Sequence, residues 1–169
     1  CYDGQNFFDS DHPVLGKDGQ EYSASNMQAG SGEPWFLVDT ARPIKPLIYQ
    51  ERTAFNMVAL DDPKDDNVFN KKEYIYGVDG RDAAGYGLWQ LAFGSKADCN
   101  ATNFKAARKA MQTLKGDQDK LLGIKPNLLV VGASNEDAAR EFLEKERLAN
   151  GETNTLRGAV ELVVVPYLG

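Results

Sequence analysis

The stretch NFKAARKAMQTLKGDQDKLLGIKPNLLVV, residues 103–131, decides the fold class of this chain. Its first half has apolar residues three or four positions apart, the spacing of a helix, at Phe104, Ala107, Met111 and Leu114. Thr102 can cap the start of this helix, and Gly116 can end it. Leu128–Val131 is predicted to be a short strand that is apolar on both faces. A helix followed by a buried strand predicts helices packed against a sheet.

The same alternation of helix and strand continues to the end of the chain. Ser134 or Asn135 can cap a second helix, which the pair Asn150–Gly151 is expected to close. The residues of this helix that should face inward are Ala139, Phe142 and Leu143. Ala159–Val165 is predicted to be the last strand. We therefore expect residues 99–169 to form a helix-strand-helix-strand unit.

Antiparallel strands are predicted upstream of this unit. Residues 1–33 are rich in Gly, Asp, Asn and Ser, which favour turns, so we expect an irregular lead-in with one short hairpin. Within residues 34–98 we expect two strand pairs, Trp35–Val38 with Leu47–Tyr49, and Lys72–Val78 with Tyr86–Phe93 across a GRDAAG turn. The segment DDPKDDN at 61–67 is too charged to bury and should be an exposed loop. The predicted class is α+β, with 1–169 as a single structural unit.

Charge and composition exclude several classes of protein. Lys and Arg number 19 against 25 Asp and Glu, and the resulting net charge of -6 disfavours dedicated binding to a nucleic-acid backbone. The longest apolar stretches fall far short of the roughly 18 residues that cross a bilayer. Two cysteines, Cys1 and Cys99, are too few for the disulfide framework of a small secreted domain, which favours a reducing compartment.

One cluster of residues could carry metal chemistry. His12 is the only histidine, and together with Asp3, Asp9 and Asp11 it offers ligands for a divalent ion. A metal-dependent hydrolase that uses these four residues is therefore the alternative function. The Asp residues of DSDH are equally what tight turns need, and no nucleophile elbow accompanies them. We expect no catalytic, cofactor-binding or metal-binding residues.

Two further features concern association with other molecules. The first helix has a basic flank in an otherwise acidic chain, formed by Lys105, Arg108, Lys109 and Lys115. Such a flank could meet an acidic patch on a partner, but a solvated helix flank is the commoner meaning and the one we favour. The chain also has 7 Tyr, 8 Phe and 2 Trp with no reactive group beside them, which is typical of large subunit interfaces.

Several long motifs, taken in order, carry a family resemblance. They are CYDGQNFFDSDHPV at 1–14, PWFLVDTARPIKPLIYQER at 34–52, VFNKKEYIYGVDGRDAAGYGLWQLA at 68–92, NFKAARKAMQTLKG at 103–116, GIKPNLLVV at 123–131 and GAVELVVVPYL at 158–168. The chain resembles the Mu-like bacteriophage major head subunit (gpT) family over nearly its whole length. It corresponds to the C-terminal half of the proteins of that family. The family's upstream half is expected to hold an N-terminal arm, an extended loop and a long spine helix.

The resemblance implies the tailed-phage major capsid fold, in its A and P domain portions, and a structural subunit rather than an enzyme. The implied partners are copies of the same chain, arranged as hexamers and pentamers in an icosahedral shell, with scaffold, portal and decoration proteins. Contact with packaged DNA would be at most non-specific, and no membrane is involved. The implied location is the virion capsid, and the host bacterial cytoplasm during assembly. A non-phage compartment protein with the same fold is a further alternative.

Overall fold

The chain divides into two compact units. The computed structural model describes residues 1–147 and 151–168. One unit, here called the body, comprises Cys1–Pro46 and Tyr86–Gly169, and the other, here called the ribbon, comprises Leu47–Gly85. The expected α+β class is confirmed, since both units combine helices with strands. We had expected a single unit with short hairpins, and the ribbon is the main departure.

A five-stranded sheet with the order β11-β10-β4-β7-β3 forms the centre of the body. Its strands are β3 (Met27–Gln28), β4 (Trp35–Val38), β7 (Ala92–Ser95), β10 (Leu128–Val131) and β11 (Glu161–Val164). β4 pairs antiparallel with both β7 and β10, whereas β11 runs parallel to β10 and β3 runs parallel to β7. The predicted strand at 128–131 is confirmed, and it lies inside the sheet, where both of its faces can be covered.

Two helices pack on one face of this sheet. The side chain of Asn100 accepts a hydrogen bond from the Asn103 N–H, so Asn100 and not Thr102 caps α2 (Ala101–Thr113). This helix ends at Thr113, three residues before the Gly116 that was predicted to end it. Two short paired strands follow, β8 (Lys115–Gly116) and β9 (Lys120–Leu121). No helix in the described residues is long and apolar enough to span a membrane.

The second helix, α3 (Glu136–Glu144), begins directly after Asn135, as predicted. It connects the parallel strands β10 and β11. Of the pair expected to close it, Asn150 lies outside the described residues, and the helix already ends at Glu144. Its end is held by Asn154, whose side-chain amide donates to the Phe142 and Lys145 carbonyls at 2.8 Å each.

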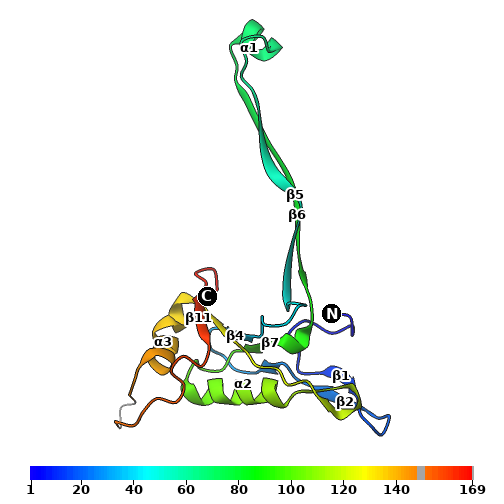
Figure 1. The fold of residues 1–169 in the computed structure, drawn as a ribbon, viewed down its shortest axis with the longest axis vertical. Coiled ribbons are helices and arrows are strands. Elements are labelled where there is room, and N and C mark those ends of the chain that lie inside the picture. The colour runs from blue at the N-terminus through cyan, green and yellow to red at the C-terminus, as the bar shows by residue number, and fades with distance from the viewer. Residues whose placement is uncertain (148–150, 169) are drawn as a thin grey trace. The chain divides into compact units, whose positions relative to one another are not determined.

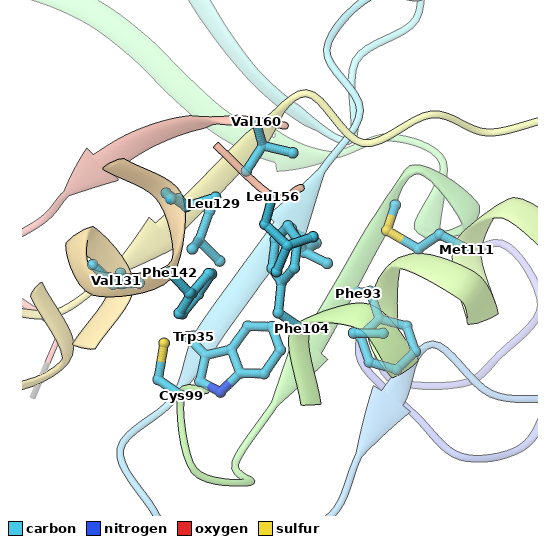
Figure 2. Close-up of a cluster of buried hydrophobic side chains, with 14 of the residues drawn as sticks. Trp35, Phe93, Cys99, Phe104, Met111, Leu129, Val131, Phe142, Leu156 and Val160 are labelled. Atoms are coloured by element: carbon cyan, nitrogen blue, oxygen red, sulfur yellow. The ribbon is translucent and has the colours of Figure 1, made fainter. Parts of the chain in front are cut away.

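The core lies between the sheet and these helices. It contains the predicted inward residues of both helices together with alternate residues of the central strands: Trp35, Leu37, Phe93, Phe104, Ala107, Met111, Leu129, Val131, Ala139, Phe142 and Leu143. Figure 2 shows Trp35, Phe104 and Phe142 turned toward one another in this space. The Trp35 Nε1–H donates to the Ala97 carbonyl at 2.7 Å, so the one polar atom of the indole is satisfied.

A smaller cluster covers the start of the body. β1 (His12–Leu15) and β2 (Glu21–Ala24) form the single short hairpin expected in the lead-in. Their buried residues pack with Phe7 against Trp89 and Ala92. Three short 3-10 turns complete the body, η1 (Trp89–Leu91), η2 (Asp117–Asp119) and η3 (Ala133–Asn135).

The ribbon is made of two long paired strands, β5 (Leu47–Leu60) and β6 (Ile75–Tyr86). They run side by side to α1 (Asp66–Lys71), which caps their far end (Figure 1). β5 is 14 residues long, or about 45 Å at the usual rise of about 3.3 Å per residue. Both strand pairs that we predicted for residues 34–98 are therefore wrong, because these strands pair with each other.

The reason lies in the glycines of GRDAAG. This hexapeptide is not a turn but lies within β6, and neither Gly80 nor Gly85 has a positive φ. A Cβ on Gly80 would lie 2.5 Å from the Phe55 ring, so the glycine makes room for the aromatic side chain of the paired strand. The Asp-rich segment at 61–67 is exposed at most positions, as expected, although α1 begins within it at Asp66.

Candidate assembly surface

The residues with potential metal chemistry lie in the body, around a buried histidine. His12 is 0% exposed and stacks on Trp89, with ring centroids 3.8 Å apart and planes 7° from parallel. Its Nδ1 lies 2.7 Å from Asp3 Oδ2, and its Nε2 lies 3.2 Å from Asn26 Oδ1. Both ring nitrogens therefore already have partners from the chain itself.

The other two candidate ligands do not join this pair. Asp9 accepts hydrogen bonds from the Asn6 side chain and the Asp11 N–H, which is the turn chemistry of a DSDH segment. Within residues 1–147 and 151–168 no group of three or more His, Cys, Asp or Glu side chains is placed to hold a metal ion. The structure thus brings together Asp3 and His12 as an ion pair, and not the four residues as a ligand set.

The neighbours of His12 also define its hydrogen-bonding role. The Asn26 amide nitrogen donates to the Phe7 and Trp89 carbonyls, so its Oδ1 faces the ring as an acceptor. Asp3 Oδ2 presents a second acceptor, to Nδ1 on the other side of the ring. Burial alone would raise the pKa of Asp3, but hydrogen bonds from His12 and the Gln5 N–H outweigh it and lower that pKa. This cluster ties the first residues of the chain to the body.

Replacement of Asp3 tests this role. Asp3→Asn is expected to lower the free energy of unfolding by about 1.5–3 kcal/mol at pH 7, the usual size for a hydrogen bond to a charged group. Because the pKa of Asp3 is lowered by folding, its contribution is complete above 3.8 and is lost as the pH falls below that value. Urea unfolding at pH 7 and pH 3 should show the gap between wild type and variant closing. Asp11→Asn, an exposed control, should change stability by under about 0.5 kcal/mol at both pH values. An Asp3→Asn gap of equal size at both would contradict this role.

The cysteines are not placed for nucleophilic catalysis. Cys99 is buried, and this burial raises the pKa of its thiol to about 11. A thiol with such a pKa is almost entirely protonated at neutral pH, so it is a poor nucleophile. Cys99 instead packs in the core beside Trp35 (Figure 2).

The ribbon is exposed along its whole length. Every residue of β5 is exposed, and so is all of β6 except Gly80. Its large exposed apolar side chains are Leu47, Ile48, Tyr49, Phe55, Met57, Val58, Leu60, Phe69, Tyr74, Ile75, Tyr76 and Val78. An isolated pair of strands is at best marginally stable in water, and long exposed strands are prone to pair with other chains. A surface of this kind is typical of a contact with another protein.

One face of the ribbon carries most of the aromatic residues. Phe55 covers Gly80, and the Tyr49 hydroxyl donates to Asp82 Oδ2 at 2.8 Å, so odd residues of β5 share a face with even residues of β6. The hydrogen bond to Asp82 raises the pKa of Tyr49. This aromatic face, as we call it, also includes three exposed side chains, Met57 at 64%, Tyr76 at 57% and Val78 at 66%.

The predicted basic flank of α2 is present on the body. Lys105 and Lys109 are exposed, Arg108 is half-buried, and all three lie beside the buried stripe of the helix. Lys115 lies beyond the helix and pairs with Asp119 at 3.3 Å. The sequence thus indicated this flank, whereas it did not indicate the ribbon, because the apolar and polar residues of β5 come in blocks and not in the alternation typical of strands.

Solved structures with this fold are phage capsid proteins. The chain is similar to the procapsid protein of bacteriophage JBD30, with a TM-score of 0.85 and 41% identity over 99% of this chain and 58% of that one. It is also similar to the JBD30 capsid, with a TM-score of 0.81 and 25% identity over 100% of this chain and 58% of that one. The fold of the chain is therefore that of phage capsid proteins.

The family model for the Mu-like prophage major head subunit gpT matches residues 1–168, so the chain belongs to this family. It is 41% identical over 177 residues to the major capsid protein of Escherichia phage Mu. It is also 41% identical over 179 residues to the Mu-like prophage FluMu major head subunit of Haemophilus influenzae. Each match covers 99% of this chain and 58% of the relative, so the chain spans a little over half the length of these relatives. The resemblance seen in the sequence motifs is confirmed.

Proposed function

We propose that this chain is part of a structural subunit of a phage or prophage icosahedral head. The subunit assembles with copies of itself into hexamers, pentamers and a shell that encloses DNA. Membership of the head subunit family supports this proposal, as does the likeness to procapsid and capsid proteins. The observation that carries it is the ribbon, whose apolar side chains have no cover within the described residues. The same observations disfavour the metal-dependent hydrolase.

Homotypic contact explains why so exposed a ribbon is tolerated. A ribbon with twelve large apolar side chains in water would be a liability in a monomer. In a shell, each copy can lay its ribbon on another and receive a ribbon in turn, because head-to-tail contacts between identical subunits close into rings. Burial of one such side chain contributes about 1.5–3 kcal/mol, so a few per contact are enough to drive association.

The proposal extends to other partners and to location. One similar solved structure is the JBD30 capsid decorated with minor capsid protein trimers, which suggests a decoration partner for this subunit as well. Scaffold and portal proteins are proposed from the family resemblance. The net charge of -6 keeps contact with the enclosed DNA non-specific and weak. We propose the virion capsid as its place, after assembly in the host cytoplasm.

Sedimentation of the complete gene product tests this function. The purified protein is expected to form shells, tubes or capsomers whose share of the material grows with concentration, because each contact is an intermolecular equilibrium. Negative-stain electron microscopy of the fast-sedimenting fraction should show closed or tubular particles. A protein that stays monomeric at every concentration up to its solubility limit would contradict the proposal.

A further inference from the structure

The basic flank of α2 has no counter-charge among the residues that the structure describes. Lys105, Arg108 and Lys109 project from a helix that contains no acidic residue. In the described part of the chain, none of the three forms an ion pair. The Arg108 Nε–H is covered by the protein and has no hydrogen-bond acceptor. The guanidinium charge of Arg108 is therefore compensated neither by an ion pair nor by a hydrogen bond from Nε within the described residues.

Several acidic side chains of the body already have cationic partners in the same chain. On α3, Glu136 and Glu144 both pair with Arg140, and Glu141 pairs with Lys145. Asp39 and Asp119 likewise have partners, Arg42 at 3.8 Å and Lys115 at 3.3 Å. These carboxylates are poor candidates for the counter-charge that the flank lacks.

The far end of the ribbon is different. The segment DDPKDD, residues 61–66, has four Asp and one Lys, a net charge of -3, and lies where β5 meets α1 (Figure 1). Asp62 and Asp65 accept backbone N–H groups, but no Asp of this tip is in an ion pair within the described residues. Lys71 and Lys72 lie beyond, at the other end of α1. Within the described residues, the tip of the ribbon thus carries unpaired acidic side chains and the flank of α2 carries unpaired basic ones.

We propose that the acidic tip, residues 61–66, of one copy docks on the basic flank of α2, Lys105, Arg108 and Lys109, of another copy. This rests on the proposed function, because it names the surface that receives the end of the ribbon. Opposite charges on two copies steer their encounter and fix the register of the ribbon, while apolar contacts along the ribbon supply most of the affinity. Each copy has one tip and one flank, so the contact is head-to-tail.

A second copy suits the flank better than a nucleic acid does. The three cations lie on a chain with a net charge of -6, and this field opposes the approach of an extended polyanion. The tip, in contrast, presents its charge on six residues at the end of a strand pair, so it can reach the flank without bringing the rest of its own acidic surface close. The contact is accordingly expected to weaken with salt, as exposed ion pairs do.

Charge reversal in the complete gene product tests the docking. K105E/K109E makes the flank acidic, and D61K/D62K makes the tip basic. At low salt each variant is expected to assemble more slowly than wild type, by on the order of tenfold or more, as measured by light scattering. A chain that carries all four substitutions should regain nearly the wild-type rate. An equimolar mixture of the two variants should assemble faster than either variant alone, because the tip of each fits only the flank of the other. This partial rescue by mixing would show that the contact joins different copies. K120E/K125E changes the same charge elsewhere on the body and should assemble like wild type.

The possible failures are distinguishable. If wild type forms no assemblies, the proposed function fails. If wild type assembles and K105E/K109E slows it no more than K120E/K125E does, only the docking is overturned. The docking is also overturned if the slow variants are rescued neither by combination nor by mixing. A K105E/K109E variant that assembles normally but loses binding to a duplex DNA oligonucleotide would overturn it as well and assign the flank to nucleic acid.

Discussion

The variant Met57→Ser, Tyr76→Ser and Val78→Ser is expected to fold normally and to form no shells. These side chains lie on the aromatic face of the ribbon and are each more than half exposed. Their loss therefore costs the fold of a single chain little. If another copy covers them, each contact loses roughly 3–6 kcal/mol of apolar burial, which lowers an association constant by at least about a hundredfold. Because a closed shell repeats the contact in every subunit, assembly should fail altogether.

Thermal unfolding measures whether the variant folds normally, and electron microscopy on the same preparations measures whether it forms shells. A matched control changes three polar residues of the opposite face, Gln50→Ser, Arg52→Ser and Asn56→Ser, and should still give particles. If the aromatic-face variant assembles as well as this control does, the ribbon is not the contact that holds the shell together. If it unfolds, the aromatic face serves the fold and not assembly.

Trp35→Ala is expected to lower the free energy of unfolding of the body by about 3–5 kcal/mol, the range for removal of a buried aromatic side chain. Trp35 is 0% exposed in the middle of the sheet, and its Nε1–H satisfies the Ala97 carbonyl. The substitution leaves a cavity and an unpaired acceptor together. Because small domains are stable by only about 5–15 kcal/mol, this loss consumes much of the total.

Urea unfolding followed by the fluorescence of the remaining Trp89 measures this loss. Phe36→Ala is the matched control, since Phe36 is the next residue of β4, points to the face without helices and is only half-buried. It should cost less than half as much as Trp35→Ala. Equal losses would mean that the two faces of the sheet are equally buried, contrary to the arrangement of the core.

The second half of the chain was predictable because its signals are local. Helical spacing at Phe104, Ala107 and Met111 and the short run at 128–131 each indicate an element by themselves, and the structure has both. The boundaries of the first helix lie two or three residues from the predicted ones, because capping depends on side-chain geometry. The sequence predicted Thr102 as the cap, whereas Asn100 accepts the hydrogen bond from the Asn103 N–H. The second helix ends at Glu144, well before the predicted Asn150–Gly151.

The ribbon could not be predicted in the same way, because strand pairing is not local. Leu47–Leu60 could in principle pair with Trp35–Val38 or with Ile75–Tyr86, and the glycines of GRDAAG favoured a turn over a continuous strand. The packing of Phe55 on Gly80 favours the pairing with Ile75–Tyr86, and this contact joins residues 25 positions apart. The strands Trp35–Val38 and Leu128–Val131 also pair, although they lie even farther apart in the sequence.

The residues around His12 form a local pattern in the sequence, but this pattern is compatible with several different structures. Asp3, Asp9, Asp11 and His12 fit a ligand set, a group of turns or an ion pair equally well in the sequence. Only the fold shows that Asp9 turns to Asn6 and Asp11, and that Asn26, 14 residues beyond His12, occupies the second ring nitrogen. Residue types alone do not distinguish a metal ligand from a satisfied buried histidine.

A cryo-electron microscopy reconstruction of particles formed by the complete gene product would show whether the ribbon is a contact between copies. We expect residues 47–85 of each subunit to lie against another copy, with Met57, Tyr76 and Val78 buried in the contact. Particles in which this ribbon extends into solvent, with its aromatic face uncovered, would contradict this expectation.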